Sequence, residues 1–396
     1  MNLKPTILLL SVLLFFSCSF KTKNNSEIAA VLDIAEAQYD LMNTAISPAF
    51  SDKKFMPRTI EDGKRRLVHV KDWTSGFYPG SLWYLYELTK DKKWKERAVR
   101  YTEKLDTIQY WEGNHDVGFI MECSYGNALK AHKTKAYEDI IVQTAKSLSA
   151  RFRPAAGVLQ SWDGNEKWAC PVIIDNMMNL ELLFNATKIS GDSLYYDIAV
   201  SHADKTIENH YRDDYSSYHV VEYDTISGAI VKKNTHQGYS DGSAWARGQA
   251  WGLYGFTMSY RETKDPKYLE QAKHIANFMR QNPNLPADQV PYWDYDAPKG
   301  PDTPRDASAA AITASALFEL SGFVSEDERT AYLNWAEKIM KSLMSPDYLA
   351  ATGTNENFLL KHSVGSIPHG VEIDVPLNYA DYYFLEALFR KGNLKD

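Results

Sequence analysis

Between Asp306 and Gly322 the sequence reads DASAAAITASALFELSG, a run made mostly of alanine, serine, isoleucine and leucine. The run has no polar face of the kind that a surface helix presents to water. A helix that is apolar on most sides must be buried on most sides. The stretch therefore predicts a helix in the interior of an all-α protein.

A charged amphipathic helix follows this run and resembles four others. Each begins at a polar turn and then carries an aromatic residue, in most cases followed by an alanine on the same helical face. The five occurrences are Lys90-Asp91 with Trp94 and Ala98, Lys133-Thr134 with Tyr137, Gly191-Asp192 with Tyr195 and Ala199, Lys264-Asp265 with Tyr268 and Ala272, and Ser325 with Tyr332 and Ala336. The spacing indicates a repeated helical hairpin.

Capping signals mark where these helices begin. Asp265 precedes Pro266, which is the favoured order for an N-cap and a first helical residue. Ser325 and Glu328 form the pattern of a capping box. Ser26 is placed to cap a first helix over residues 27–42, whose apolar positions follow helical spacing.

Each amphipathic helix is followed by a more apolar one that is rich in small residues. The second set begins near Gly76, Asp116, Val172, Ser243, Asp306 and Pro376. Six outer and six inner helices in alternation predict a closed (α/α)6 toroid, an all-α fold. Tyr218 to Lys232 is the exception, because its alternation and its Ser227-Gly228 turn favour a small β-hairpin on the barrel.

The first residues read as an export signal. Lys4 precedes the apolar run from Ile7 to Phe16, which is too short to span a bilayer as a stable anchor. Residues 1–18 are expected to be a lipoprotein-type signal peptide with Cys18 as the lipidated residue; an ordinary cleaved signal is the alternative. Residues 19–25 are expected to form a polar tether and 26–396 a single domain, which is expected to be exported to the periplasm of a Gram-negative bacterium and held there by the lipid.

Composition excludes several classes of function. The net charge of −7 argues against a nucleic-acid partner, which requires a basic stripe. Cys123 and Cys170, the two cysteines after the signal, form no disulfide framework, and the sequence leaves open whether they pair. The chain has no phosphate loop, dinucleotide fingerprint, nucleophile elbow or HExxH motif, so we expect neither a cofactor nor a metal.

Two aspartates open successive inner helices. Asp116 lies in HDVGF and Asp175 in IIDNMM, and all inner helices run in one direction, so both residues should meet at one end of the barrel, the mouth. Each could simply be an N-cap. Burial and a neighbouring carboxylate would raise the pKa of such an acid and let it donate a proton, whereas a helix N-terminus would oppose that shift.

Other polar and aromatic residues gather in the same loops. His219, His236 and Gln237 suit hydrogen bonding to sugar hydroxyls, and Arg247 can pair a carboxylate or sulfate or else form a salt bridge on the rim. Trp73 and Trp162 could stack on sugar rings or could line the barrel as core residues.

Several short segments, in this order, resemble glycoside hydrolase family 88, the unsaturated glucuronyl hydrolases. They are DWTSGF at 72–77, HDVGF at 115–119, IDNMMNL at 174–180, SSYH at 216–219, THQG at 235–238, WARGQAWG at 245–252 and YADYYFLEAL at 379–388. The resemblance spans nearly the whole mature chain. It implies the same (α/α)6 barrel and a hydrolase that hydrates the C4=C5 double bond of a terminal unsaturated uronic acid.

The resemblance also implies roles for individual residues. Asp175 would protonate C4 and assist the attacking water, and Asp116 would bind ring hydroxyls and help to keep Asp175 protonated. Lys361-His362-Ser363 resembles the segment of members that accept sulfated glycosaminoglycan fragments. The expected substrate-binding residues are Trp73, His115, Trp162, His219, Gln237, Trp245, Arg247, Lys361, His362 and Ser363.

The expected substrates are lyase-generated chondroitin, hyaluronan or heparin oligosaccharides, sulfated or unsulfated. One alternative is an unsaturated rhamnogalacturonyl hydrolase acting on pectin fragments. Two others come from different classes. A sugar epimerase on the same barrel would work through histidines, and a non-catalytic sugar-binding lipoprotein would have no need of Asp175 in an apolar setting.

Overall fold

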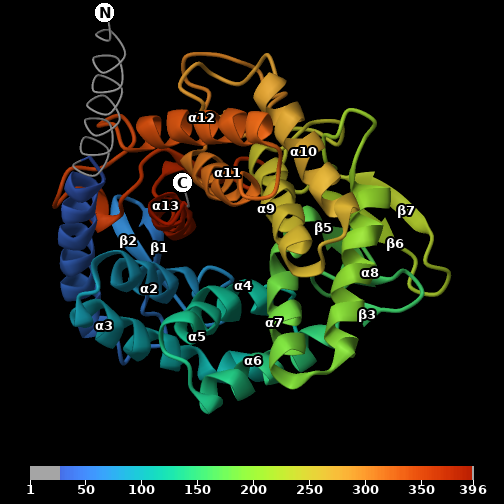
Figure 1. The fold of residues 1–396 in the computed structure, drawn as a ribbon, viewed down its shortest axis with the longest axis horizontal. Helices are drawn as coiled ribbons and strands as arrows, with labels where there is room; N and C mark the ends of the chain where they lie inside the picture. The colour runs from blue at the N-terminus through green and yellow to red at the C-terminus, as the bar shows by residue number, and fades with distance from the viewer. Residues whose placement is uncertain (1–26, 395–396) are drawn as a thin grey trace, which may run out of the picture.

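Two concentric layers of helices form a ring (Figure 1) in the computed structural model, which describes residues 27–394. The inner layer contains α2 (Phe77–Thr89), α4 (Val117–Met121) with α5 (Asn127–Ala131), α7 (Leu180–Ser190), α9 (Ala246–Thr263), α11 (Ala307–Leu320) and α13 (Asn378–Gly392). The outer layer contains residues 27–46, α3 (Lys92–Thr102), α6 (Lys135–Ser149), α8 (Ser193–His210), α10 (Pro266–Gln281) and α12 (Glu326–Leu343).

The inner layer closes on itself because α13 packs against both α11 and α2. Every residue of α11 except Glu319 is buried, as its lack of a polar face predicts. The predicted (α/α)6 toroid is confirmed. Two inner elements are less regular than expected: a π-helical turn, η3 (Glu122–Gly126), joins α4 to α5, and a 3-10 helix, η4 (Ile174–Asn179), leads into α7.

The predicted caps of two outer helices are present. The Asp265 side chain accepts a hydrogen bond from the Lys267 backbone N–H, with Pro266 as the first helical residue. Ser325 and Glu328 form the capping box. The expected cap at Ser26, the signal peptide 1–18 with Cys18, and the tether 19–25 lie outside the described residues.

Every strand among residues 27–394 lies in a long connection that leads from an outer helix to the next inner helix. The strands are β1 (Met56–Glu61), β2 (Lys64–Val68), β3 (Phe152–Arg153), β4 (Val158–Leu159), β5 (Pro171–Ile173), β6 (Val220–Tyr223), β7 (Ile230–Asn234), β8 (Ser363–Ser366) and β9 (Val371–Val375). The return connections are short turns. The long connections, with their strands, therefore gather at the mouth.

The predicted hairpin within Tyr218 to Lys232 is present as β6 and β7, paired antiparallel. Gly228 adopts the left-handed conformation in its turn, with φ +74°. The predicted β-hairpin decoration is confirmed, and it is more extensive than one hairpin: β5 pairs with β6, and three further two-stranded sheets are present, β1-β2, β3-β4 and β8-β9.

Three short 3-10 segments complete the described elements, η1 (Ser47–Ala49), η2 (Glu103–Tyr110) and η5 (Asn355–Asn357). Cys123 and Cys170 are both buried and free, so they do not pair. Within residues 27–394, no helix has the length and apolar character needed to cross a bilayer.

The approach of α2 to α4 generates a prediction. A Cβ added at Gly76 would lie 2.2 Å from the carbonyl oxygen of Ile120, a backbone atom that cannot rotate away. We expect Gly76→Ala to lower the free energy of unfolding by about 1–3 kcal/mol, the usual cost of overpacking. Urea denaturation measures the change.

The matched control is Gly242→Ala, because a Cβ at Gly242 would meet no atom within 4 Å. This variant should unfold at the wild-type urea concentration. Equal unfolding midpoints for the two alanine variants would show that the two inner helices can separate at no cost.

Candidate active site

A small cavity of about 130 Å³ lies at the mouth of the barrel. It is lined by residues from the first four long connections and from the helices that they enter: Trp73, His115, Asp116, Trp162, Ile173, Asp175, His219, His236, Gln237 and Arg247. Eight of the expected catalytic and substrate-binding residues thus lie together in this cavity. The two aspartates share one pocket, which is the arrangement that the proposed chemistry requires.

Neither aspartate acts as a helix cap through its side chain. Asp116 occupies the N-cap position of α4, yet its carboxylate makes no capping hydrogen bond. Asp175 lies in the first turn of η4, which likewise has no side-chain cap at its N-cap residue. The N-cap interpretation is therefore wrong for both residues, and both carboxyl groups are left to line the pocket.

Asn179 fixes the ring of His115. The Asn179 side-chain oxygen accepts a hydrogen bond from the Phe119 backbone N–H at 2.8 Å, so its amide nitrogen faces His115 Nδ1, 3.2 Å away. Because that amide nitrogen is a donor, Nδ1 accepts and the ring proton sits on Nε2. Nε2 lies 3.4 Å from Asp116 Oδ1. Burial lowers the pKa of His115 to about 4, so the ring is neutral at higher pH.

His219 is oriented toward the second aspartate in the same way. Its Nδ1 accepts hydrogen bonds from the backbone N–H groups of His236 and Gln237, at 3.1 and 3.0 Å. The proton of the neutral ring therefore sits on Nε2, which lies 3.6 Å from Asp175 Oδ2. Each carboxylate thus faces the N–H of its own histidine.

The two carboxyl groups differ in acidity. Burial, followed by the charge of Asp175, raises the pKa of Asp116 well above its ordinary value. Burial also raises the pKa of Asp175, but His219 and then Arg247 outweigh burial and hold that pKa below its ordinary value. The two shifts run in opposite directions and favour a proton on Asp116 over one on Asp175 in the free site. The resemblance implies the reverse order, which leaves out the effect of His219 and Arg247 on Asp175.

Arg247 lines the pocket, but both of its Nη atoms already bind other groups of the protein. Its Nη1 lies 3.0 Å from Asp306 Oδ2 and also donates to the Val364 carbonyl, and its Nη2 donates to the Gly365 carbonyl at 2.7 Å. Only Nε is buried without a hydrogen-bond partner. The salt bridge considered in the sequence analysis exists, though it is buried rather than on the rim. A bidentate grip on a substrate anion would require breaking it.

Trp245 supports the pocket rather than lining it. Its ring lies 4.6 Å from the ring of His219, and the Arg247 guanidinium lies 4.5 Å from its centre. Trp73 and Trp162 do line the cavity. Trp73 also packs against Tyr379, at 4.9 Å between ring centres, so it has both the core role and the exposed face that were considered for it.

Lys361, His362 and Ser363 lie outside the lining of this cavity. The Lys361 ammonium donates to the Pro346 carbonyl at 2.7 Å, and His362 Nδ1 lies 2.6 Å from Asp374 Oδ1. Ser363 is fully buried at the start of β8, the strand whose carbonyls bind Arg247. The structure therefore places this segment behind and beside the pocket.

Ile173 lines the cavity but was not predicted from the sequence, and His236 lines it although the final set of expected substrate-binding residues omitted it. His236 lies beside Trp162, at 5.6 Å between ring centres, and beside His369, at 4.3 Å. Its place directly before Gln237 supports the interpretation that it belongs with His219 and Gln237 as a hydrogen-bonding residue of the mouth. Ile173 ends a buried strand and carries no polar group, so the sequence offers no comparable signal.

The barrel is built from helices, and one small pocket at its mouth holds two carboxyl groups that cap no helix, two oriented histidines and two tryptophans. This combination defines a glycoside hydrolase of the (α/α)6 class. The family comparison agrees, because the profile of Glycosyl Hydrolase Family 88 matches residues 52–384. The chain belongs to this family, and the predicted family and enzyme class are confirmed.

Known proteins of this family are similar over most of the chain. An "Unsaturated glucuronyl hydrolase" of Formosa agariphila is 50% identical over 329 residues, which cover 83% of this chain and 82% of that protein. The crystal structure of an unsaturated glucuronyl hydrolase specific for heparin is 48% identical, with a TM-score of 0.88 over 92% of this chain and 97% of that one. A Streptococcus agalactiae unsaturated glucuronyl hydrolase mutant complexed with dGlcA-GalNAc6S is 29% identical, with a TM-score of 0.75 over 92% and 91%.

Proposed function

We propose that this enzyme removes a C4=C5-unsaturated uronic acid from the non-reducing end of glycosaminoglycan oligosaccharides. The observation that carries the proposal is that the carboxyl groups of Asp116 and Asp175 lie in one small pocket and that neither caps a helix. At about 130 Å³ the cavity is below the usual range for drug-sized ligands, and it favours one terminal sugar ring over the interior of a chain.

The reaction is acid-catalysed addition of water to a vinyl ether. A proton adds to C4, and the oxygen of a water molecule adds to C5, which gives a hemiketal with the ring oxygen. The hemiketal opens to a ketone at C5 and a hemiacetal at C1. Collapse of the hemiacetal forms an aldehyde and releases the neighbouring sugar as an alcohol. No displacement at the anomeric carbon is needed, unlike in the two-carboxylate glycosidases.

Asp175 is the proton donor to C4 and the base that receives a proton from the attacking water. Its Oδ2 is buried without a hydrogen-bond partner among the described residues, so it is open to a ligand. Asp116 stores the proton in the free site. When the uronate brings a second negative charge into the pocket, protonation of Asp175 becomes more favourable, because like charges raise the pKa of a carboxyl.

The remaining lining residues orient the aspartates or bind the sugar. His115 and His219 direct their Nε2 atoms at Asp116 and Asp175. Gln237 offers its amide to the ring hydroxyls, and Trp73 and Trp162 present flat faces to the sugar ring. The single free donor of Arg247, Nε, is the contact that it can offer without breaking its ion pair with Asp306.

The relatives favour uronic acid substrates from glycosaminoglycans over the rhamnogalacturonan alternative, since their names specify glucuronyl groups and heparin. The site also disfavours an epimerase, because each histidine is already hydrogen-bonded at Nδ1 and directed at an aspartate through Nε2. A binding protein without catalysis would gain nothing from two buried acids that repel one another.

The two aspartates should differ in a matched pair of variants. Asp175→Asn should lower kcat by about 10²–10⁴-fold at every pH, the usual contribution of general acid–base catalysis, while binding survives. Asp116→Asn removes the proton store but leaves the donor, so its residual activity should depend on pH. The measurement is loss of the ultraviolet absorbance of the C4=C5 bond in unsaturated disaccharides.

The sign of the pH effect follows from the two pKa shifts. In the wild type the pair holds its proton until the pH exceeds the raised pKa of Asp116, so activity falls as pH rises through that value. In Asp116→Asn only Asp175 can hold the catalytic proton. Because the pKa of Asp175 is lowered, the activity of this variant should fall at a lower pH than that of the wild type. An unchanged rate in Asp175→Asn, or identical pH limits for wild type and Asp116→Asn, would refute these roles.

We propose that sulfated fragments are accepted as well, with Lys361 at the edge of the mouth as the anion contact. Its ammonium has three donors, one of which binds the Pro346 carbonyl. Lys361→Ala should raise KM about two- to fivefold for a chondroitin disaccharide with a sulfated hexosamine, as expected for an exposed ion pair.

The same variant should leave KM for the unsulfated disaccharide unchanged. Lys133→Ala, in the turn before α6 at the opposite end of the barrel, is the control for loss of one positive charge. Equal effects of Lys361→Ala on both disaccharides would exclude a role in sulfate recognition.

We also propose that the chain is exported and anchored to a periplasmic membrane face through a lipid on Cys18. Lys4 and the apolar run from Ile7 to Phe16 support this proposal. Cys18→Ala should move the enzyme from the membrane fraction to the soluble fraction of lysed cells of its source bacterium, because one lipid-modified cysteine supplies the anchor. Wild-type protein in the soluble fraction would contradict the proposal.

A further inference from the structure

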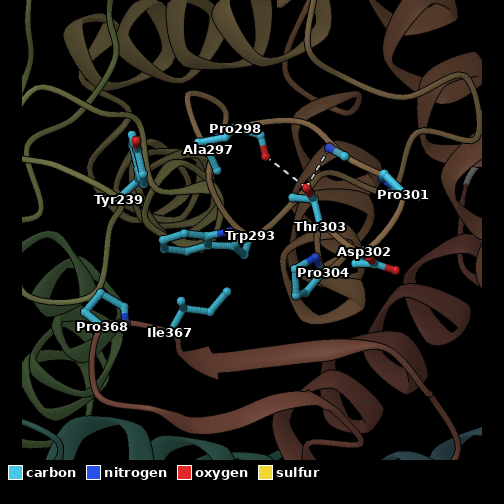
Figure 2. Close-up of a pocket in the computed structure, with 11 residues that line it drawn as sticks. Tyr239, Trp293, Ala297, Pro298, Pro301, Asp302, Thr303, Pro304, Ile367 and Pro368 are labelled. Atoms are coloured by element: carbon cyan, nitrogen blue, oxygen red, sulfur yellow. Dashed lines mark hydrogen bonds between the residues drawn. The ribbon is translucent and has the colours of Figure 1, made fainter.

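A second and larger cavity, of about 570 Å³, lies at the mouth beside the site already described. Figure 2 shows Trp293 at its centre, with Tyr239 to one side, Thr303 and Pro304 to the other, and Ile367 with Pro368 across from Ala297. All of these residues belong to long connections, between β7 and α9, between α10 and α11, and in the turn of the β8–β9 hairpin.

The two cavities have walls in common. His236 lines the first cavity, and Tyr239, three residues later, lines the second. The ring of His236 lies 4.3 Å from that of His369, and His369 directly follows Ile367 and Pro368 of the second cavity. A chain that leaves the first cavity past the His236–His369 contact therefore reaches the second one.

The second cavity is preformed. Thr303 Oγ1 accepts a hydrogen bond from the Gly300 N–H and donates one to the Pro298 carbonyl, each at 2.9 Å, so its loop is braced. The Tyr239 backbone N–H donates to Asp294 Oδ2 at 2.9 Å. Tyr239 nevertheless keeps half of its surface exposed, with its ring 6.3 Å from that of Trp293. A rigid exposed aromatic ring can bind a ligand at little cost in conformational entropy.

The lining chemistry selects for a neutral ligand. Two aromatic rings, four prolines, an alanine and an isoleucine form most of the wall, and neither lysine nor arginine is among the residues that line it. The one charged lining residue, Asp302, would repel a sulfate or a carboxylate. The apolar face of an uncharged sugar ring, with an acetyl methyl group, matches such a wall.

We propose that this cavity is a distal subsite, which holds an unsulfated N-acetylated hexosamine of the leaving chain when the substrate is longer than a disaccharide. The inference rests on the proposed function. It assigns the preference for chain length to Tyr239 and Trp293, outside the pocket where the bond is hydrated.

The test compares unsaturated hyaluronan disaccharide with unsaturated hyaluronan tetrasaccharide, both unsulfated. Tyr239→Ala should raise KM for the tetrasaccharide roughly 3- to 10-fold, the scale of one aromatic contact, and leave KM for the disaccharide unchanged. Tyr239→Phe keeps the ring and should behave as wild type. Leu194→Ala, which truncates another exposed apolar side chain, at the far end of the barrel, is the control.

A second variant tests the same subsite without removing a contact. Pro301→Asp adds a negative charge at an exposed lining position and should weaken the tetrasaccharide alone, because the leaving chain carries a uronate. Equal KM changes for both substrate lengths, or no change in either variant, would overturn the subsite. A wild-type enzyme that hydrates neither substrate would instead refute the proposed function.

Discussion

The buried ion pair between Arg247 and Asp306 is the interaction on which the mouth of the barrel depends. Asp306 Oδ1 caps α11 through the Ser308 backbone N–H at 3.0 Å, while Oδ2 binds Arg247 in the first turn of α9. Arg247 also binds the Val364 and Gly365 carbonyls of β8. Three segments far apart in the sequence are thus held at one point. Because both side chains are almost inaccessible to water, loss of either would leave an uncompensated charge, at a cost of about 3–5 kcal/mol.

The same pair sets the chemistry of the site through a short series of contacts. The Arg247 guanidinium lies over the Trp245 ring, Trp245 lies against His219, and His219 directs its Nε2 at Asp175. Arg247 also lowers the pKa of Asp175 by its charge. The position of the shared proton therefore follows from how α9, α11 and β8 pack, and not from the two aspartates alone.

Local signals predicted the fold, and nonlocal contacts account for what was missed. A few neighbouring residues were enough to predict the caps at Asp265 and Ser325 and the buried helix α11, because helix formation depends on near neighbours in the sequence. The β8–β9 hairpin was not predicted, since short strands are stabilised by partners across the sheet and by Arg247. Asp116, Asp175 and Arg247, which lie at or near the starts of inner helices, line one pocket as the helix direction predicts. The direction of the Asp175 pKa shift could not be predicted from the local sequence, because it depends on a histidine 44 positions away in the chain.

Parallel inner helices explain how a chain of net charge −7 can hold an acidic sugar in a cavity whose lining includes one arginine and no lysine. All six inner elements point their N-termini, and so their positive dipole ends, at the mouth. At the opposite end, Arg261 and Arg390 lie in the last turns of α9 and α13, where cations offset the negative dipole ends. Helix N-termini favour anions without adding mobile side chains. The fold thus supplies a fixed field for the uronate at the same place where it brings together two carboxyl groups.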